Sequence, residues 1–220
     1  MQTSDNVEQA MPRYYAQRAA EYERVFDKPH RQADIATLKA WLRGQFAGRH
    51  VLEVATGTGF WLPEATADAA SWLGTDLNAE VLAIARLKPL DFTRVGFELA
   101  NAYALGDTLR GRRFDAAFAG LWFSHVPMSR REAWLRGLHA QLSRGARVVL
   151  MDNRYVDGDS TPVTRFDAEG NGFQRRQLSD GSEHEVLKNF PTADEFAALL
   201  GGRPFEFREL GYFWTLVYEV

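Results

Sequence analysis

One segment constrains the fold of this chain more than any other: residues 51–61, which read VLEVATGTGFW. A short apolar run reaches an acidic residue, then a turn built from small residues, then a helix-like segment. This order predicts a β-strand that feeds a ligand-binding turn in an α/β sheet. Gly57 and Gly59 allow positive φ and a close backbone approach to a ligand. A helix that begins near Phe60 would direct its free N–H groups toward the same ligand.

The spacing of the small residues separates two classes of ligand. A dinucleotide-binding turn needs a third glycine for close packing of helix on strand, and Leu62 occupies that position here. Glu53 lies on the strand just before the turn and would repel a pyrophosphate. A carboxylate suits a cationic group instead, such as an amine or a sulfonium. The turn therefore favours a ligand with a cationic group over a dinucleotide.

A second acidic residue lies where a ribose ligand is expected. Asp76 ends an apolar run that begins at residue 71. Nucleotide-binding sheets accept the ribose hydroxyls from such a position, about 20 residues after the turn. Asn78 can cap a helix over 79–88, which Pro89 ends. The alternative is that Asp76 is only a turn or capping residue.

In the rest of the chain, predicted helices alternate with predicted β-strands. Helices are predicted over 11–26, 31–46, 60–69, 79–88, 129–142 and 191–200, and strands over 51–54, 71–76, 95–100, 114–119, 146–151, 205–210 and 213–220. Such alternation predicts an α/β fold, with helices on both faces of a parallel sheet and right-handed crossovers. No internal repeat or interdomain linker interrupts the 220 residues, so we expect a single domain over 1–220.

The region after the fifth predicted strand departs from this alternation. Residues 152–172 are rich in Gly, Asp, Asn, Ser and Thr, which predicts a long loop. The flanking segments of a turn at 179–182 predict a hairpin, so we expect a loop-hairpin insertion over about 152–190. Arg175 and Arg176 of the hairpin could clamp a carboxylate, but a surface position is the favoured interpretation.

The turn resembles motif I of class I S-adenosylmethionine-dependent methyltransferases, E-x-G-x-G-x-G. Glu53, Gly57 and Gly59 match it, and Ala55 stands where the family has its first glycine. The resemblance covers about the whole chain, because the family also ends with a strand pair like the one predicted over 205–220. It implies a Rossmann-like seven-stranded, mostly parallel sheet with the last strand antiparallel. It also implies S-adenosyl-L-methionine as cofactor and S-adenosyl-L-homocysteine as product.

The same resemblance implies which residues bind the cofactor. Asp76 would accept the ribose hydroxyls, Asn101 would contact the adenine, and Glu53 would face the amine or the backbone of the turn. Asn101 could equally be an ordinary residue at the start of a loop. The other predicted cofactor contacts are Tyr14, Tyr22, Ala55, Thr56, Gly57, Gly59, Leu77, Ala102 and Gly120.

In the family, the segment after the fourth strand lines the methionine part of the cofactor and the reacting centre. Here that segment contains Trp122 and Phe123, which we predict as substrate contacts. An aromatic face near a sulfonium is favourable, although aromatic residues at the end of a buried strand also pack in cores. His125 is the predicted catalytic residue, as a general base near neutral pH. A lone histidine is more often structural, so a structural role is the alternative.

The first predicted helix carries several tyrosines. Residues 14–22 read YYAQRAAEY and resemble the Tyr-x-x-Arg-Ala-x-x-Tyr lid that precedes motif I in many small-molecule methyltransferases. The resemblance implies a helical lid over about 11–46, with Tyr15 at the substrate. The alternative is an amphipathic helix with a tyrosine stripe. Arg154 and Tyr155, after the fifth strand, are further predicted substrate contacts.

Composition limits the class of partner and the compartment. The net charge of −3 gives no overall attraction to nucleic acid, and the Asn/Asp-Pro-Pro-Tyr motif of base-modifying methyltransferases is missing after the fourth strand. The absence of cysteine favours a reducing compartment, so we expect a cytoplasmic protein. No apolar segment is long enough for a membrane span. No metal is expected, because the acids of the loop after residue 151 are typical of solvated loops.

The sequence therefore predicts an enzyme that transfers a methyl group from S-adenosylmethionine to an O, N or S nucleophile of a small molecule. The reaction would be an in-line displacement, assisted by positioning and by exclusion of water. The alternative is a non-catalytic regulatory or scaffold protein that binds the same cofactor. The sequence leaves the identity of the acceptor and the oligomeric state open.

Overall fold

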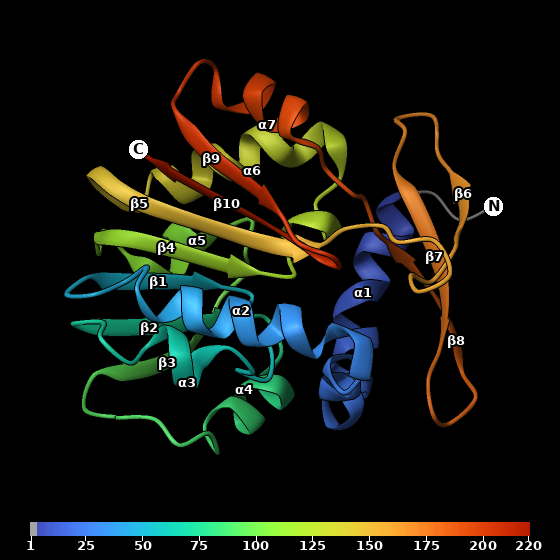
Figure 1. Ribbon diagram of the computed structural model, residues 1–220, viewed down its shortest axis with the longest axis horizontal. Coiled ribbons are helices and arrows are strands. Elements are labelled where there is room, and N and C mark those ends of the chain that lie inside the picture. The colour runs from blue at the N-terminus through green and yellow to red at the C-terminus, as the bar shows by residue number, and fades with distance from the viewer. Residues whose placement is uncertain (1–3) are drawn as a thin grey trace.

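The computed structural model describes residues 4–220 and is built around one seven-stranded sheet (Figure 1). The spatial order of its strands is β3-β2-β1-β4-β5-β10-β9. Only β10 runs against its neighbours β5 and β9, which confirms the predicted antiparallel last strand among the described residues. The strands span His50–Val54 (β1), Ser71–Asp76 (β2), Val95–Leu99 (β3), Phe114–Gly120 (β4), Leu142–Asn153 (β5), Phe205–Glu209 (β9) and Phe213–Glu219 (β10).

The strand order fixes where a ligand can bind. The chain starts the sheet at β1, adds β2 and β3 on one side, and then crosses to β4 and β5 on the other. Ligands of open α/β sheets bind beyond the carboxyl ends of the strands, at the point where this order reverses. That point lies between β1 and β4, so the turn after β1 faces the expected crevice.

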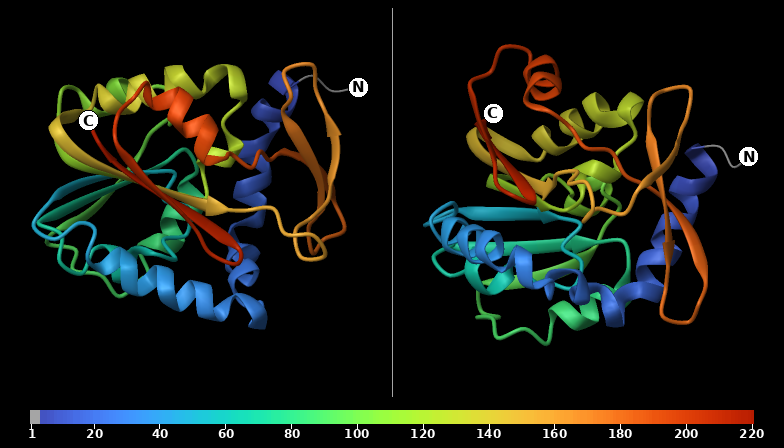
Figure 2. Two further views of the ribbon diagram at one scale, coloured as in Figure 1. Left: turned by 45° about the horizontal axis from the view of Figure 1, so that its top comes forward. Right: turned by 45° about the vertical axis from the view of Figure 1, so that its right-hand side comes forward.

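Helices cover both faces of the sheet, as predicted (Figures 1 and 2). Phe46 and Phe118 are buried in the core cluster on one face, and Phe196 and Trp214 are buried in the cluster on the other. The first face carries α2 (Gln32–Arg43), α3 (Leu62–Ala65) and α4 (Ala79–Ala85). The second carries α5 (Leu105–Leu109), α6 (Arg131–His139) and α7 (Ala193–Leu200).

Several element bounds differ from the prediction. The helix expected over 129–142 ends at His139, because Leu142 pairs with Phe114 and already belongs to β5. Leu142 continues the apolar spacing of α6, so periodicity alone could not assign it to the strand. The helix expected over 60–69 is limited to α3, since the chain turns back after Thr66 toward β2. The short helix α5 was not predicted.

A second, three-stranded antiparallel sheet lies beside the main one. It contains β6 (Val163–Phe166), β7 (Gly172–Gln177) and β8 (Glu183–Leu187). The predicted hairpin corresponds to β7 and β8. The strand β6 falls within 152–172, where we expected a loop, because its four residues are too few to stand out from their turn-rich surroundings.

The N-terminal region lies between the two sheets (Figures 1 and 2). It comprises the helix α1 (Ser4–Arg18) and the 3₁₀ segments η1 (Ala19–Phe26) and η2 (Pro29–Arg31), where one helix over 11–26 was predicted. Met11 and Tyr14 of α1 share an apolar cluster with Phe173 of β7 and Leu187 of β8. Because α1 and the small sheet pack on each other, they form one cover at the ligand-binding edge of the main sheet.

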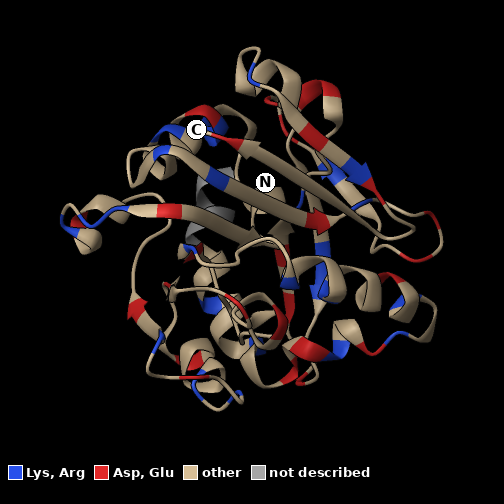
Figure 3. Ribbon diagram, turned by 60° about the vertical axis from the view of Figure 1, so that its left-hand side comes forward, with Lys and Arg blue, Asp and Glu red and all other residues tan. Residues whose placement is uncertain are grey.

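Charge is distributed without a dominant sign on the side of the molecule shown in Figure 3. Lysine and arginine are interspersed with aspartate and glutamate over the helices and loops, and the edge strand β9 also carries both signs. Within residues 4–220, no helix has both the length and the apolar character needed to cross a bilayer.

Candidate active site

The turn after β1 has positive φ at its two glycines, which their lack of a Cβ allows, and also at Ala55. Ala55, Gly57 and Gly59 have φ angles of 55°, 59° and 74°. A Cβ on Gly59 would lie 2.7 Å from the Leu62 side chain and 3.1 Å from Cβ of Ala85, so this glycine allows close packing. A Cβ on Gly57 would meet no atom within 4 Å. Gly57 therefore keeps the backbone open toward the crevice, where a side chain would occupy ligand space.

Glu53 lies beneath the turn. The residue is buried, and one carboxylate oxygen accepts hydrogen bonds of 2.9 Å each from the Thr56 hydroxyl and from Nε1 of Trp72. Burial is the main cause that raises the pKa of Glu53 to about 7, and the two hydrogen bonds act against the rise. In the described structure Glu53 thus holds the turn through Thr56.

The raised pKa of Glu53 predicts a pH-dependent stability. The native state keeps the proton up to about pH 7, whereas the unfolded chain releases it near the ordinary pKa of 4.5, so unfolding becomes easier as pH rises between these values. Glu53→Gln removes this titration and keeps an acceptor oxygen. We expect the free energy of unfolding of the variant, relative to that of wild type, to rise by on the order of 2 kcal/mol from pH 5 to pH 8. Urea unfolding of both proteins without cofactor, at each pH, measures this difference. An identical stability difference at both pH values would contradict the assignment.

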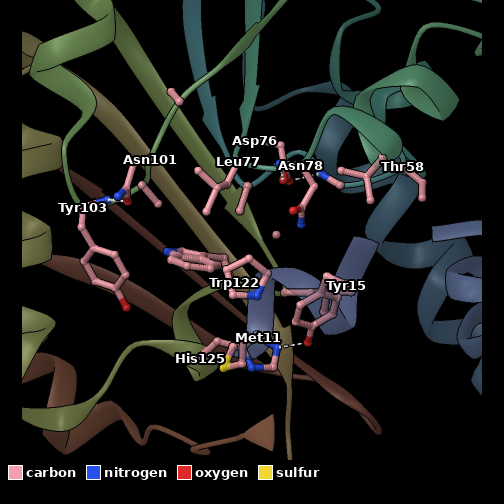
Figure 4. Close-up of a pocket in the computed structure, with 18 of the residues that line it drawn as sticks. Met11, Tyr15, Thr58, Asp76, Leu77, Asn78, Asn101, Tyr103, Trp122 and His125 are labelled. Atoms are coloured by element: carbon pink, nitrogen blue, oxygen red, sulfur yellow. Dashed lines mark hydrogen bonds between the residues drawn. The ribbon is translucent and has the colours of Figure 1, made fainter. Parts of the chain in front are cut away.

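Asp76 connects the turn to the end of β2. Its carboxylate accepts one 2.9 Å hydrogen bond from the backbone N–H of Gly57 and another of 2.9 Å from the N–H of Asn78. Burial raises the pKa of Asp76, and these N–H groups oppose the rise. The carboxylate is therefore held at the carboxyl edge of the sheet, facing the crevice (Figure 4).

A cavity of about 420 Å³ opens at this edge, within the size range of small-molecule sites. Its wall includes residues that follow the four strands β1, β2, β3 and β4 (Figure 4). The structure brings together these predicted site residues in the wall: Tyr15, Tyr22, Ala55, Gly57, Asp76, Leu77, Asn101, Ala102, Gly120, Trp122 and His125.

Sequence reasoning missed several other residues of the wall. Most of them neighbour a predicted residue in the chain, and that adjacency was the available signal. Met11, Pro12, Val81 and Arg130 carried no such signal, because only the fold brings them to the sheet edge. The missed residues are Met11, Pro12, Thr58, Asn78, Val81, Ala100, Tyr103, Leu121 and Arg130.

Two buried polar atoms of the wall have no hydrogen-bond partner among the described residues. They are Nε1 of Trp122 and the hydroxyl oxygen of Thr58. Buried polar groups normally have partners, and neither atom is exposed to the cavity, so a ligand would reach them only after the side chains turned. The open space at Gly57 and the carboxylate of Asp76 are available to a ligand with polar or cationic groups.

His125 and Tyr15 meet at the end of the cavity. The Tyr15 hydroxyl is 2.8 Å from Nε2 of His125, and Nδ1 is 2.6 Å from the carbonyl oxygen of Leu187. A carbonyl only accepts, so Nδ1 carries the proton and Nε2 accepts from Tyr15. Burial lowers the pKa of His125 to about 3 and raises the pKa of Tyr15 to about 12. Both side chains are therefore neutral at neutral pH.

A second cavity of about 520 Å³ adjoins the first. The two share four wall residues, namely Tyr15, Tyr22, Leu121 and His125. The second cavity is enclosed by the N-terminal segment and the small sheet, and Tyr14, predicted as a cofactor contact, lies in its wall instead of the first. The shared residues place the Tyr15–His125 pair at the junction of two ligand-sized spaces.

Six predicted site residues line neither cavity. Glu53, Thr56 and Gly59 form the support of the turn, and Phe123 is buried against Trp134 and Phe196 in the core. Arg154 donates a 2.8 Å hydrogen bond to the carbonyl oxygen of Leu210, and Tyr155 packs edge-on against Phe190.

Comparison with known proteins identifies the family. A model described as "Methyltransferase domain" matches residues 51–145, which contain the turn, Asp76 and His125. Among curated proteins, no sequence matches this chain. The structure of a DhpI-SAM-HEP complex is similar over 100% of both chains, with 26% identity and a TM-score of 0.80. A DhpI-SAH complex is similar over 98% of this chain and 97% of its own, with 27% identity and a TM-score of 0.75.

A more distant structure supports the fold alone. An S-adenosylmethionine dependent methyltransferase from Mesorhizobium loti is 19% identical, with a TM-score of 0.60, over 84% of this chain and 96% of its own. The two DhpI complexes hold the cofactor and its demethylated product. The sequence motif, the sheet order and these similarities agree. The chain is a class I S-adenosylmethionine-dependent methyltransferase, an enzyme that uses S-adenosylmethionine as cofactor and releases S-adenosylhomocysteine.

Proposed function

We propose that this enzyme methylates an O, N or S nucleophile of a small molecule. The observation that carries the proposal is the second cavity, which adjoins the first at the Tyr15–His125 pair. Its volume of about 520 Å³ suits a small molecule. The cover formed by α1 and the small sheet lies over this edge (Figure 2). A polymer would have to displace that cover to reach the junction.

Residues of the first cavity would bind the cofactor. Asp76 would accept hydrogen bonds from the ribose hydroxyls, Asn101 would contact the adenine, and the backbone at Gly57 would approach the ligand closely. The bound cofactor supplies an activated methyl group on a sulfonium.

Residues at the junction would position the acceptor. Tyr15 and His125 lie in the walls of both cavities, so an acceptor in the second cavity would contact them as it approaches the methyl group. The segment 11–46 acts in this proposal as the lid that excludes water, because α1 and η1 supply Tyr15 and Tyr22 to the junction. Holding nucleophile and methyl group in line is then the main contribution of the protein to the rate.

Removal of the His125 side chain should impair turnover and spare cofactor binding. His125→Ala leaves the Tyr15 hydroxyl without its acceptor, so the junction loses its fixed geometry. A lost hydrogen bond of about 1–1.5 kcal/mol corresponds to roughly tenfold in kcat/KM for the acceptor. Steady-state kinetics and calorimetry with S-adenosylhomocysteine measure the two effects. Unchanged kcat/KM would exclude His125 from the acceptor site.

The proposal is tested by following a labelled methyl group. The full chain is incubated with methyl-labelled S-adenosylmethionine and, in separate reactions, with a panel of small metabolites, with DNA, with RNA and with a protein extract. We expect label in members of the metabolite panel. Label confined to a macromolecule would contradict the small-molecule assignment.

A further inference from the structure

We propose that the acceptor is an anion and that its charged oxygen, of a carboxylate or phosphoryl type, is the atom that receives the methyl group. This inference rests on the small-molecule function proposed above and specifies its substrate class. Positive charge gathers around the second cavity. Seven lysines and arginines but one carboxylate, Asp159, are among the described residues that line it.

Part of this positive charge is neutralised within the protein. Asp159 binds Lys28 at 2.7 Å and also contacts Arg31. Lys188 is buried and lies 2.7 Å from Asp152, which has no exposed side-chain surface. At the rim, Arg24 lies 3.5 Å from Glu21, and Arg175 lies 3.9 Å from Glu183.

Arg18 and Arg176 remain, and neither has a carboxylate partner within 4 Å among the described residues. The guanidinium of Arg18 lies over the rings of Tyr14 and Tyr22, at 5.7 and 5.1 Å from their centroids. Arg176 donates a 2.7 Å hydrogen bond to the side-chain oxygen of Gln174, and its buried Nε has no partner in the described chain. These contacts are with neutral groups, and the carboxylate that interacts electrostatically with Arg18 is Glu21, which is already paired with Arg24, so the region keeps a net positive charge.

These two charges act on the same small region. Both guanidinium groups interact electrostatically with the Tyr15 hydroxyl, and both also interact with the Lys188 ammonium. Burial, together with Arg176 and Arg18, lowers the pKa of Lys188, while Asp152 opposes the shift. Like charges gathered in a partly enclosed cavity repel each other, and an anionic ligand relieves that repulsion. This excess of positive charge lies beside Tyr15, at the junction with the first cavity.

The chemistry of the junction agrees with an anion. An alcohol, amine or thiol that arrives protonated must lose a proton for its methylated product to be neutral. The imidazole of His125 is a weak base, because burial lowers its pKa, and the lone pair on its Nε2 already accepts from the Tyr15 hydroxyl. A carboxylate or phosphoryl oxyanion needs no base. Its lone pair forms the C–O bond while the S–C bond breaks, the bonding pair stays on sulfur, and the anionic and sulfonium charges cancel without proton transfer.

Anion binding is tested on the full chain loaded with S-adenosylhomocysteine. Inorganic phosphate and acetate are titrated separately at constant ionic strength, as probes of a phosphoryl and a carboxylate group, with affinity measured by calorimetry. Arg176→Gln keeps hydrogen-bond donors and removes the charge. We expect it to weaken binding of the preferred probe by roughly tenfold or more, as for a lost charge-assisted hydrogen bond. Arg18→Gln gives a second measurement if Arg176→Gln fails to fold.

Arg208→Gln is the matched control. Arg208 lies on the exposed surface of β9 and lines neither cavity, so its substitution changes net charge equally and should leave both affinities unchanged.

The labelled product should also carry one negative charge less than its acceptor on anion exchange. Failure of both probes to bind, or equal binding by the Arg176 and Arg208 variants, would overturn the inference. Label in a neutral small molecule would also overturn the inference of an anionic acceptor, but the proposed function would stand. Label in macromolecules alone would refute the proposed function itself.

Discussion

Replacing Asp152 by alanine is expected to destabilise the protein by about 3–5 kcal/mol, a larger loss than any other single substitution proposed for this chain. Asp152 lies near the end of β5 and has no exposed side-chain surface. One carboxylate oxygen binds Nζ of Lys188 at 2.7 Å, and the other accepts from the backbone N–H of Ser124 at 3.1 Å. Without Asp152, the Lys188 ammonium would stay buried and unpaired, which is far more costly than the loss of an exposed ion pair.

The pKa of Asp152 has the direction that this pairing requires. Burial alone would raise it, but the Lys188 ammonium and the hydrogen bonds keep the pKa below its ordinary value. A carboxyl group with a lowered pKa contributes stability above its unfolded pKa and loses that contribution as pH falls through the folded pKa. The full decrease in the free energy of unfolding of Asp152→Ala should therefore be observed at neutral pH.

Urea unfolding of three variants tests this prediction. Asp152→Ala should show the full loss, and Asp152→Leu combined with Lys188→Met should recover much of it, because no buried charge remains. Glu132→Ala is the control: its ion pair with Arg136 is 71% and 70% exposed, so it should cost less than about 1 kcal/mol. A loss of that small size in Asp152→Ala would contradict a stabilising role for the buried pair of Asp152 and Lys188.

Replacing Asp76 by alanine should weaken binding of S-adenosylmethionine by at least about tenfold, or about 1.4 kcal/mol. Two effects act in the same direction. The variant loses the proposed acceptor for the ribose hydroxyls, and the N–H groups of Gly57 and Asn78 lose their common partner. The turn is then less ordered before the ligand arrives, so binding must also provide the free energy to order it.

Calorimetry with S-adenosylhomocysteine measures this effect. Asp76→Asn separates the two causes, since the amide oxygen can still accept from one backbone N–H but cannot accept as a charged group. Asp107→Ala, in the exposed part of α5, is the control and should bind like wild type. If Asp76→Ala bound the ligand as tightly as wild type, the ribose assignment would be wrong.

The fold was predictable from the sequence where local signals and the sheet agree. The turn at Gly57 and Gly59 has positive φ, as its composition requires, and the alternation of apolar segments predicted the parallel sheet, while the family resemblance implied its antiparallel last strand. Predictions failed where a short element depends on its partner. Leu142 belongs to β5 because Phe114 pairs with it, and β6 is ordered by β7.

The residues of the candidate site also divide into those that local sequence signals predicted and those that only the tertiary structure brings together. Asp76 ends β2, and Asn101 and His125 follow β3 and β4, so their positions at the carboxyl ends of predicted strands, together with the family resemblance, predicted that they line one edge. Lys188 and Arg176 come from the second sheet and its end, and only the docking of that sheet on α1 brings them to Tyr15. No spacing in the sequence encodes that contact, which is why Arg176 was interpreted as a surface residue and Lys188 was not predicted.

A crystal structure of the full chain grown with S-adenosylhomocysteine tests the central claim most directly. We expect density in the cavity of about 420 Å³, with the ribose hydroxyls hydrogen-bonded to Asp76 and the sulfur directed toward the junction at Tyr15 and His125. Density for the ligand at another surface, or a ribose remote from Asp76, would contradict it.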